Sequence, residues 1–312
     1  MREKRDTDHL ITESVNPASM EIDCCSTEGI LRLISAEDAK VARAVENEIP
    51  NIGKAVDKIV DTLRSGGRLF FVGAGTSGRL GVMEAAECPP TFGTEPSQVR
   101  GIIAGGKRAL YRSVEGAEDS PEGAVYELEK ERFSKGDFLV GIAASSGTPY
   151  VEGAIAYASG MGAGTALITC NPVPKEIADV TVTLLVGPEV IVGSTRLKSA
   201  TATKMALNML TTAAMIRMGK TYGNLMVEVK PASEKLRSRQ ERIVMSLLGV
   251  NRSAAQKLLQ RARRDVKAAV LMDKLNVSFA DAKKRLAREG GFLRRALGEE
   301  GGGKDGRGND GA

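Results

Sequence analysis

The chain has 312 residues and a net charge of +5, with 42% hydrophobic and 27% charged residues. These proportions are ordinary for a globular protein, and the length suffices for one large domain or for a large and a small one. No apolar run is long enough to span a membrane and no apolar signal segment follows residues 1–5, so we expect a cytoplasmic protein without membrane contact. Because tryptophan is absent and aromatic residues make up 4%, the basic residues toward the C-terminus predict a solvated helical face and no nucleic acid partner.

The histidine and cysteine content limits the chemistry further. The single histidine, His9, lies in a polar N-terminal segment, which argues against a histidine-based catalytic triad and against a histidine-rich metal site, and we expect no metal. General acid–base catalysis would then require Glu, Asp, Lys or Tyr. Cys24, Cys25, Cys88 and Cys170 lack metal-ligand spacing, so we expect reduced, mostly buried thiols.

The N-terminal part of the chain predicts helices. Residues 1–10 are expected to be disordered, and a helix is predicted from 26 to 34. Ser35-Ala-Glu-Asp38 has the pattern of a capping box that opens a further helix. Residues 49–63 carry apolar side chains at helical spacing, which predicts an amphipathic helix packed on one face.

A strand, a turn and a helix follow between residues 68 and 90. Leu69 to Val72 form a short apolar run that predicts a buried strand, and the glycines at 73, 75 and 78 then alternate with small residues. Residues 79–87 suit a helix, which Pro89-Pro90 should end. A glycine-rich turn before a helix N-terminus predicts an anion site, because its N–H groups are free and the helix dipole favours negative charge.

Residues 73–78 also match the dinucleotide pattern G-x-G-x-x-G, which is weak when it stands alone. A dinucleotide site requires an acidic residue at the end of the next strand, where it holds the ribose hydroxyls. The next predicted strand, 99–104, ends instead in Gly105-Gly106-Lys107. The sequence therefore favours an anion site in which the hydroxyls of Thr76 and Ser77 take part.

A second strand–turn–helix unit repeats this arrangement. Residues 137–144 predict a buried strand, Ser145-Ser-Gly-Thr148 a turn, and 149–160 a helix. With further strands predicted at 163–170 and 180–186, the alternation indicates an α/β fold with a doubly wound, mainly parallel five-stranded sheet flanked by helices. Ligands bind such sheets at the carboxyl ends of the strands, so both hydroxyl-bearing turns are expected at one site.

The rest of the chain predicts helices, the first of them at about 199–218. The patterns Ser253-Ala-Ala-Gln256 and Ser278-Phe-Ala-Asp281 predict capping boxes within a compact three-helix unit at about 250–297. We therefore expect four regions, which are an N-terminal helical extension (1–48), the α/β domain (49–232), a small C-terminal all-helical domain (233–297) and a disordered tail (298–312).

Longer motifs make the interpretation more specific. They are Gly73-Ala-Gly-Thr-Ser-Gly-Arg-Leu-Gly-Val82, Glu87-Cys-Pro-Pro-Thr-Phe92, Ile103-Ala-Gly-Gly106, Val114-Glu-Gly-Ala-Glu-Asp-Ser120, Gly141-Ile-Ala-Ala-Ser145, Thr148-Pro-Tyr-Val151, Gly193-Ser-Thr-Arg196 and Gly223-Asn-Leu-Met226. The two hydroxyl-bearing turns resemble those of sugar isomerase (SIS) domains, which bind phosphosugars without metal or nucleotide. The motifs together, over about residues 10–297, resemble the N-acetylmuramic acid 6-phosphate etherase family, which implies an SIS domain at 49–232 and no cofactor.

The resemblance implies a lyase that cleaves the D-lactyl ether of N-acetylmuramic acid 6-phosphate, giving N-acetylglucosamine 6-phosphate and D-lactate in peptidoglycan recycling. In that family a base removes the C2 proton of the open-chain sugar, lactate leaves from C3, and water then adds. On the matching positions, Glu87 takes the proton-donor role and Glu118 the second catalytic position. Ser77, Ser145 and Thr148 match positions that hold the sugar phosphate in SIS domains.

Each of these residues also has an ordinary structural explanation. Glutamates at helix ends are usually solvated, and hydroxyls in turns usually cap helices. To donate a proton near neutral pH, Glu87 would need a raised pKa, through burial or through Glu84 one helical turn earlier. Arg196 and Lys198 are suited either to an anionic ligand or to structural salt bridges.

The sequence departs from the family pattern in the second turn, where Ser146-Gly147 replaces a usual Gly-Arg pair, and Ser199-Ala200 replaces a common Ala-Gly. The lost arginine bears on affinity or substrate range. Two other functions remain open: a non-catalytic phosphosugar sensor similar to the glucokinase regulatory protein, and an aldose–ketose isomerase. Because SIS domains commonly pair, we expect a homodimer whose site a partner completes.

Overall fold

The computed structural model describes residues 10–145, 147–231 and 233–299, so His9, Ser146 and the predicted tail beyond Glu299 lie outside the described residues. The chain forms two compact units. The first comprises residues up to 89 together with 94–214, and the second comprises residues 90–93 together with the chain from 215 onward. Within the described ranges, no helix is long and apolar enough to cross a membrane.

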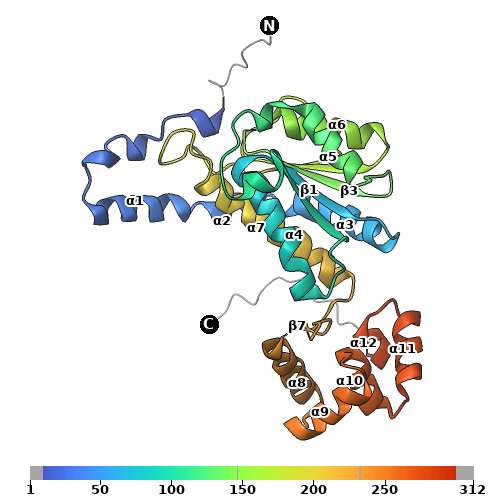
Figure 1. Cartoon of the computed structure of the whole chain (residues 1–312). Helices are drawn as coiled ribbons and strands as arrows, with labels where there is room; N and C mark the ends of the chain where they lie inside the picture. Colours follow the sequence, from blue (N-terminus) through green and yellow to red (C-terminus); the bar gives the residue numbers. More distant parts are fainter. Residues whose placement is uncertain (1–9, 146, 232, 300–312) are drawn as a thin grey trace. The chain divides into compact units, whose positions relative to one another are not determined.

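The first unit is built on a parallel sheet of five strands in the order β2-β1-β3-β4-β5 (Figure 1). The strands are β1 (Leu69–Gly73), β2 (Val99–Ile103), β3 (Phe138–Ile142), β4 (Gly164–Thr169) and β5 (Val180–Thr183). Gly73 pairs with Ile103 on one side and with Ile142 on the other, so β1, β2 and β3 end level with one another. The strand order reverses between β1 and β3, and ligands bind at such a switch point.

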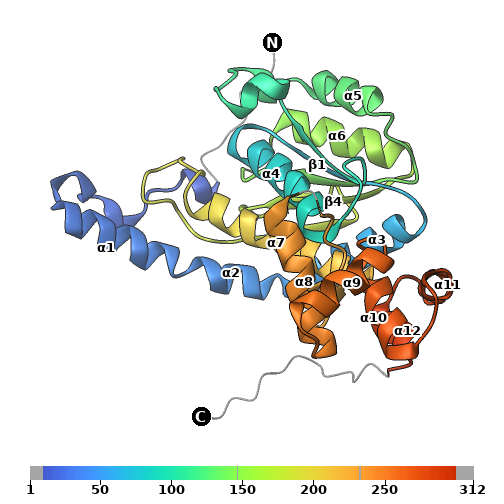
Figure 2. The ribbon, with the colours of Figure 1, turned by 60° about the horizontal axis from the view of Figure 1, so that its bottom comes forward.

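Helices cover both faces of this sheet, which confirms the predicted doubly wound α/β fold. In Figures 1 and 2, α5 (Pro121–Lys130) and α6 (Pro149–Gly160) lie on one side of the strands. The helices α3 (Ile49–Arg64), α4 (Gly75–Phe92) and α7 (Lys198–Arg217) lie on the other. Because both faces are covered, every residue of β1 and β3 is buried, as expected for parallel strands.

The helix α4 extends beyond its predicted limits at both ends. It begins at Gly75 and passes through Pro89-Pro90 to Phe92, so the prediction that the prolines end it is wrong. Both prolines fall in the last turn of the helix. Each removes one N–H donor there, but no further helical turn follows that would depend on the lost hydrogen bonds. The chain leaves the helix at Gly93, whose φ of +66° suits glycine.

The N-terminal arm comprises three short 3-10 turns (Ile11–Glu13, Pro17–Ser19 and Ile22–Cys24), α1 (Thr27–Asp38) and α2 (Val41–Asn47). The cap of α1 is Ser26, whose hydroxyl accepts a hydrogen bond from the N–H of Gly29 at 3.2 Å. Ser35 therefore lies inside α1, and the prediction that it opens a new helix is wrong. A helix that already has a cap continues through an internal Ser-x-x-Asp pattern.

The second unit contains a two-stranded antiparallel ribbon and a group of helices. These elements are β6 (Thr221–Tyr222), β7 (Leu225–Met226), α8 (Glu234–Leu248), α9 (Arg252–Arg261), α10 (Val266–Leu275), α11 (Phe279–Arg288) and α12 (Leu293–Leu297). The stretch from 250 to 297 thus holds four helices where three were predicted. Ser278 caps α11 as predicted, whereas α9 is capped by Asn251, so that Ser253 lies within the helix.

The cysteines divide into two groups. All four are free, with Cys88 and Cys170 buried and Cys24 and Cys25 exposed, so the expectation of mostly buried thiols holds for half of them. Burial, with a smaller contribution from Glu84 and Glu87, raises the pKa of Cys88 to about 12. This thiol is therefore unreactive at neutral pH.

Candidate functional site

The turn between β1 and α4 is shaped by close backbone contact. A Cβ on Gly78 would lie 2.6 Å from the carbonyl oxygen of Gly73, and a Cβ on Gly73 would lie 2.8 Å from the amide nitrogen of Gly78. Gly75 adopts a φ of +53°, which favours glycine. Backbone geometry therefore explains why glycine occupies all three positions of the motif. These glycines bring the N-terminus of α4 directly to the end of β1.

A cavity of about 130 Å³ opens at this helix N-terminus. It is lined by Ala74, Gly75 and Arg79 from the turn and helix, and by residues from the segment after β2 that include Glu115 and Glu118. The side chain of Arg79 is oriented by a hydrogen bond of 3.3 Å from its Nε to the carbonyl oxygen of Leu110. The cavity thus joins a helix N-terminus and a guanidinium, two features that attract anions, to carboxylates.

Two glutamates line the cavity, and they differ in their partners. Glu115 accepts a hydrogen bond of 2.6 Å from the hydroxyl of Ser113. Glu118 lies in a 3-10 turn (Ala117–Asp119), is exposed, and makes no hydrogen bond or ion pair with the residues that the structure describes. Of the two, Glu118 has the carboxylate that is available to a ligand.

The second hydroxyl-bearing turn follows β3, the strand next to β1. Ser145 and Thr148 are half-buried, and Thr148 occupies the N-cap position of α6. Its carbonyl oxygen accepts hydrogen bonds from Val151 and Glu152, both at 3.0 Å, but its side chain forms no capping hydrogen bond. Because Ser77 and Thr148 stand beside the ends of neighbouring strands, the structure places both hydroxyl-bearing turns at the same edge of the sheet, as predicted.

Glu87 lies at the other end of α4. It is ten residues from Ser77, which corresponds to about 15 Å along the helix axis. Its side chain is exposed and has no hydrogen-bond or ion-pair partner in the described part of the chain. A single chain therefore does not bring Glu87 to the turn that holds Ser77.

Glu84, one turn before Glu87, has a structural role. Its carboxylate is buried and accepts hydrogen bonds from Asn208 Nδ2 at 2.8 Å and from Thr211 Oγ1 at 2.5 Å. Both donors belong to α7, so Glu84 joins α4 to α7. This contact fixes the rotation of α4 about its axis.

Lys198 proves to be a structural residue. It is 1% exposed, and its ammonium lies 2.5 Å from Oε2 of Glu37 in α1. Burial alone would raise the pKa of Glu37, but hydrogen bonds from Lys198 and Lys40 hold it at about 2. Lys198 is therefore not available to a phosphate, and the salt-bridge alternative is confirmed.

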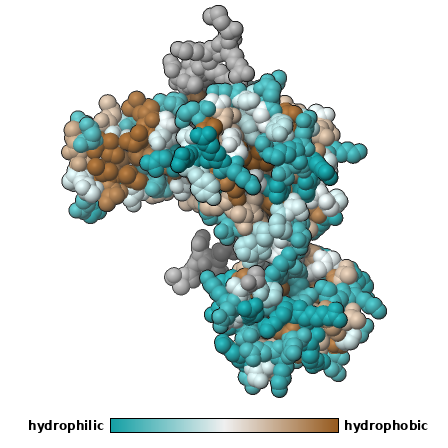
Figure 3. Space-filling model, in the orientation of Figure 1, coloured by the Kyte–Doolittle hydropathy of each residue, from teal (hydrophilic) through white to brown (hydrophobic). Residues whose placement is uncertain are grey.

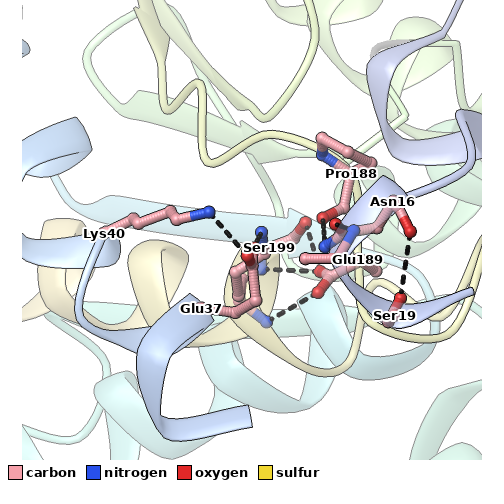
Figure 4. Close-up of polar contacts among 9 residues, drawn as sticks. Asn16, Ser19, Glu37, Lys40, Pro188, Glu189 and Ser199 are labelled. Atoms are coloured by element: carbon pink, nitrogen blue, oxygen red, sulfur yellow. Dashed lines mark hydrogen bonds and ion pairs between the residues drawn. The ribbon is translucent and has the colours of Figure 1, made fainter. Parts of the chain in front are cut away.

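The same region ties the N-terminal arm to the rest of the first unit (Figure 4). Glu189 accepts hydrogen bonds from the N–H of Ser199 at 2.9 Å and from its hydroxyl at 2.8 Å. Asn16 of the arm donates to the carbonyl oxygen of Pro188 at 3.2 Å. The N-terminus of α7 is thus occupied by an internal carboxylate and does not present an anion site.

The sequence-based prediction named both turns and Glu118 but not Arg79, which lines the same cavity as Glu118. The signal was present, because Arg79 directly follows the last glycine of the turn and stands in the first longer motif. A doubly wound sheet with two hydroxyl-bearing turns at its switch point, beside an anion-attracting cavity, defines a phosphosugar-binding domain of the SIS class. In agreement, residues 51–159 match the family model of the glucokinase regulatory protein N-terminal SIS domain.

Comparison with curated proteins extends the relationship over most of the chain. The chain is 49% identical to the N-acetylmuramic acid 6-phosphate etherase of Clostridium botulinum (strain Okra / Type B1) over 94% of its length and 97% of that protein. It is 48% identical to N-acetylmuramic acid 6-phosphate etherase 2 of Vibrio cholerae, with 93% and 95% covered, and 48% identical to the etherase of Klebsiella aerogenes, with 94% and 98% covered. The chain belongs to the N-acetylmuramic acid 6-phosphate etherase family, and it is an enzyme of the carbon–oxygen lyase class.

Proposed function

We propose that the chain removes D-lactate from N-acetylmuramic acid 6-phosphate and thereby forms N-acetylglucosamine 6-phosphate. The observation that carries the proposal is the unengaged carboxylate of Glu118 in one cavity with the N-terminus of α4 and with Arg79. In that cavity a phosphate attracted by the helix N-terminus lies within reach of an acid–base group. The substrate comes from the family, since a fold alone does not fix a substrate.

The residues divide the work between binding and proton transfer. The N–H groups at the start of α4 and the hydroxyls of Ser77, Ser145 and Thr148 hold the sugar phosphate. One carboxylate takes the C2 proton of the open-chain aldose, and the electron pair left on C2 forms the C2=C3 double bond as the C3–O bond to lactate breaks. The other carboxyl group, assigned to Glu87, protonates the departing lactyl oxygen. Water then adds its hydroxide to C3 and its proton to C2.

We further propose that the active form is a homodimer in which Glu87 of one copy meets the binding turns of the other. About 15 Å of helix separates Glu87 from Ser77 in one chain, whereas the phosphate and the reacting carbons belong to one small sugar. Glu87 also lacks the burial that a proton donor at neutral pH requires, and a second copy would supply it. Two-fold symmetry would then give two equivalent sites.

The N-terminal arm and the segment before α7 together offer an apolar surface for this pairing. Val15, Met20, Ile191 and Val192 are between 49% and 72% exposed and lie around one groove of about 320 Å³. Figure 3 shows apolar side chains gathered over the same arm. Clustered exposed apolar residues indicate a protein interface.

The cellular location and the metabolic role are also part of the proposal. We place the enzyme in the cytoplasm, acting on peptidoglycan sugars that are being recycled. The division into an extension (1–48), an SIS domain (49–232), a helical domain (233–297) and a tail also remains a prediction.

The decisive experiment is incubation with N-acetylmuramic acid 6-phosphate and measurement of D-lactate, without added metal or nucleotide. We expect D-lactate and N-acetylglucosamine 6-phosphate in equal amounts. Tight phosphosugar binding without lactate would contradict the proposal and favour the non-catalytic sensor. Conversion of an aldose phosphate to its ketose without lactate would favour the isomerase.

A further inference from the structure

The second unit contains a cavity that the proposed reaction does not use. It has a volume of about 410 Å³ and is bordered by the segment before α8, by the turn between α9 and α10, and by α11. This volume lies in the range typical of small-ligand sites. It exceeds the volume of about 130 Å³ at the N-terminus of α4.

The cavity is lined by more basic than acidic side chains. The basic ones are Lys230, Arg263, Arg264, Lys267 and Lys283, and the acidic ones are Glu228 and Asp265. Both carboxylates have cationic partners, since Glu228 pairs with the buried Lys267, and Asp265 pairs with Lys283 at 2.8 Å. Five cationic side chains against two carboxylates make the lining basic, with Glu241 outside the lining facing Arg264, and a basic lining favours an anionic ligand.

Two of these cations stand on an unusual backbone. Arg263 and Arg264, which join α9 to α10, have φ values of +51° and +64°, a conformation that glycine adopts far more easily. The N–H of Arg263 donates to the carbonyl oxygen of Gln260 and that of Arg264 to Leu259, which is a Schellman helix end, where glycine is the usual residue. Two arginines in these positions cost stability, and such residues gather at functional sites.

The surrounding structure holds this turn in place. Nε2 of the buried Gln240 in α8 donates to the carbonyl oxygen of Arg264 at 2.9 Å and to that of Val229 at 2.8 Å. The Nη1 atom of Arg264 is buried and lies 3.9 Å from Glu241, and it has no hydrogen-bond acceptor in the described residues. The side chain as a whole is 37% exposed and lines the cavity, and an arginine carries five N–H donors, so Arg264 has further donors besides the buried one.

The start of α10 adds backbone donors to the same wall. Asp265, Val266 and Lys267 all line the cavity, and they are the cap and the first two residues of this ten-residue helix. Asp265 Oδ1 accepts from the N–H of Ala268, but the N–H groups of the first two helical residues have no acceptor within the helix. A helix N-terminus and arginines together suit the oxygens of a phosphate group.

We propose that this cavity binds a small phosphorylated metabolite, at a second site separate from the catalytic one. The phosphate accepts hydrogen bonds from Arg263, Arg264 and the start of α10, and the remaining volume holds the organic part. The inference does not depend on the etherase reaction.

The test is isothermal titration of the full chain with inorganic phosphate at constant ionic strength. It uses the variant Ser77→Ala/Thr148→Ala, in which the proposed catalytic phosphate site is weakened. One phosphate per chain should still bind. Absence of any phosphate binding in this variant would overturn the proposal, whatever its lactate activity.

Arg264→Gln in that background should weaken phosphate binding at least tenfold. The matched control is Arg252→Gln, because Arg252 also lies 3.9 Å from Glu241 but does not line the cavity. Its phosphate affinity should remain unchanged. Equal affinities in the two variants would contradict the site.

Arg263→Gly separates binding from folding. Glycine accepts the positive φ more easily, so the thermal midpoint should be unchanged or higher while phosphate affinity falls at least tenfold. Phosphate should raise the midpoint of the parent protein but not that of the variant. A variant that binds phosphate like its parent would show that Arg263 serves the turn alone.

Discussion

The two ends of α4 differ in what they provide. At its N-terminus, the contact between Gly73 and Gly78 holds the backbone against β1, beside a cavity with Arg79 and Glu118. At its C-terminus, Glu87 is exposed and has no partner among the described residues. One motif-rich helix thus carries both the proposed phosphate-binding turn and the proposed proton donor, and ten helical residues, about 15 Å, separate them within one chain. This difference is the reason for proposing that each chain holds two half-sites and that catalysis joins half-sites from two copies.

The sharpest test of that comparison mixes two inactive variants. Glu87→Gln and Glu118→Gln should each lower kcat about 10²- to 10⁴-fold, the usual contribution of a positioned acid or base. If the half-sites come from different copies, a mixed dimer has one site with both glutamates and one with neither. Half of the dimers are mixed after random exchange, so D-lactate release should recover to about one quarter of the parent rate.

The control is Glu115→Gln, which changes a neighbouring carboxylate that is already bonded to Ser113. It should retain activity close to that of the parent. Failure to recover lactate release after proven subunit exchange would place both glutamates of one site in the same chain.

A second experiment breaks the pairing itself. Met20→Glu with Ile191→Glu places charges on the apolar groove between the N-terminal arm and the segment before α7, where both side chains are more than half exposed. Sedimentation should show monomers, and lactate release should fall to the level of Glu87→Gln. A fully active monomer would refute the two-copy site. Unchanged dimers would move the interface elsewhere.

A third experiment probes the binding end alone. Ser77→Ala and Thr148→Ala each remove a hydroxyl, and a hydrogen bond to a charged group is worth about 1.5–3 kcal/mol. KM for the phosphosugar should rise about ten- to hundredfold, with a smaller change in kcat. Ser278→Ala is the control, because it removes the cap of α11 and should lower stability by about 1 kcal/mol without changing KM. If neither turn variant changed KM, the two hydroxyls would have a structural role in the turns and no role in binding the phosphosugar.

The smallest effect concerns the glycine contact at the binding end. Gly78→Ala would place a Cβ 2.6 Å from the carbonyl oxygen of Gly73 and should destabilise the fold by about 1–3 kcal/mol. Gly53→Ala in α3 has no atom within 4 Å and should stabilise it by about 0.5–1 kcal/mol. Thermal unfolding of the two variants measures the difference. Equal thermal midpoints in the two variants would mean that the backbone of the turn can shift to accommodate the added methyl group, which would contradict the prediction.

The sheet was predictable because its strands are continuous apolar runs that alternate with helical segments, and both binding turns follow such runs directly. The end of α4 could not be predicted in this way. The rule that proline ends a helix placed the end at Pro89-Pro90, whereas the helix continues to Phe92 and ends before Gly93. The predictions that Ser35 and Ser253 begin helices were wrong because each helix already has a cap earlier in the chain, Ser26 and Asn251 respectively. A capping pattern alone does not reveal such an earlier cap.

The roles of Lys198, of Glu84 and of the basic cavity depend on contacts between residues far apart in the sequence. Lys198 looked equally suited to a phosphate and to a salt bridge until α1 placed Glu37 beside it. The basic cavity of the second unit could not be predicted because its residues, Gly93 and others spread from 227 to 291, converge only in the fold. The sequence suggested that Glu84 could tune Glu87, but the partners of Glu84 lie in α7, more than a hundred residues away.

The parallel sheet also has a consequence for how the chain folds. Leu69 of β1 pairs with Phe138 of β3, 69 residues later, and no local hairpin can substitute for that contact. Sheets with such distant pairings form slowly, whereas the helices α8 to α12 contact near neighbours along the chain. During synthesis, β1 can pair with β2 on one side, but its other side stays unpaired until β3 has been made. Refolding followed by separate probes should therefore show the C-terminal helices forming before the sheet, and simultaneous formation would contradict this order.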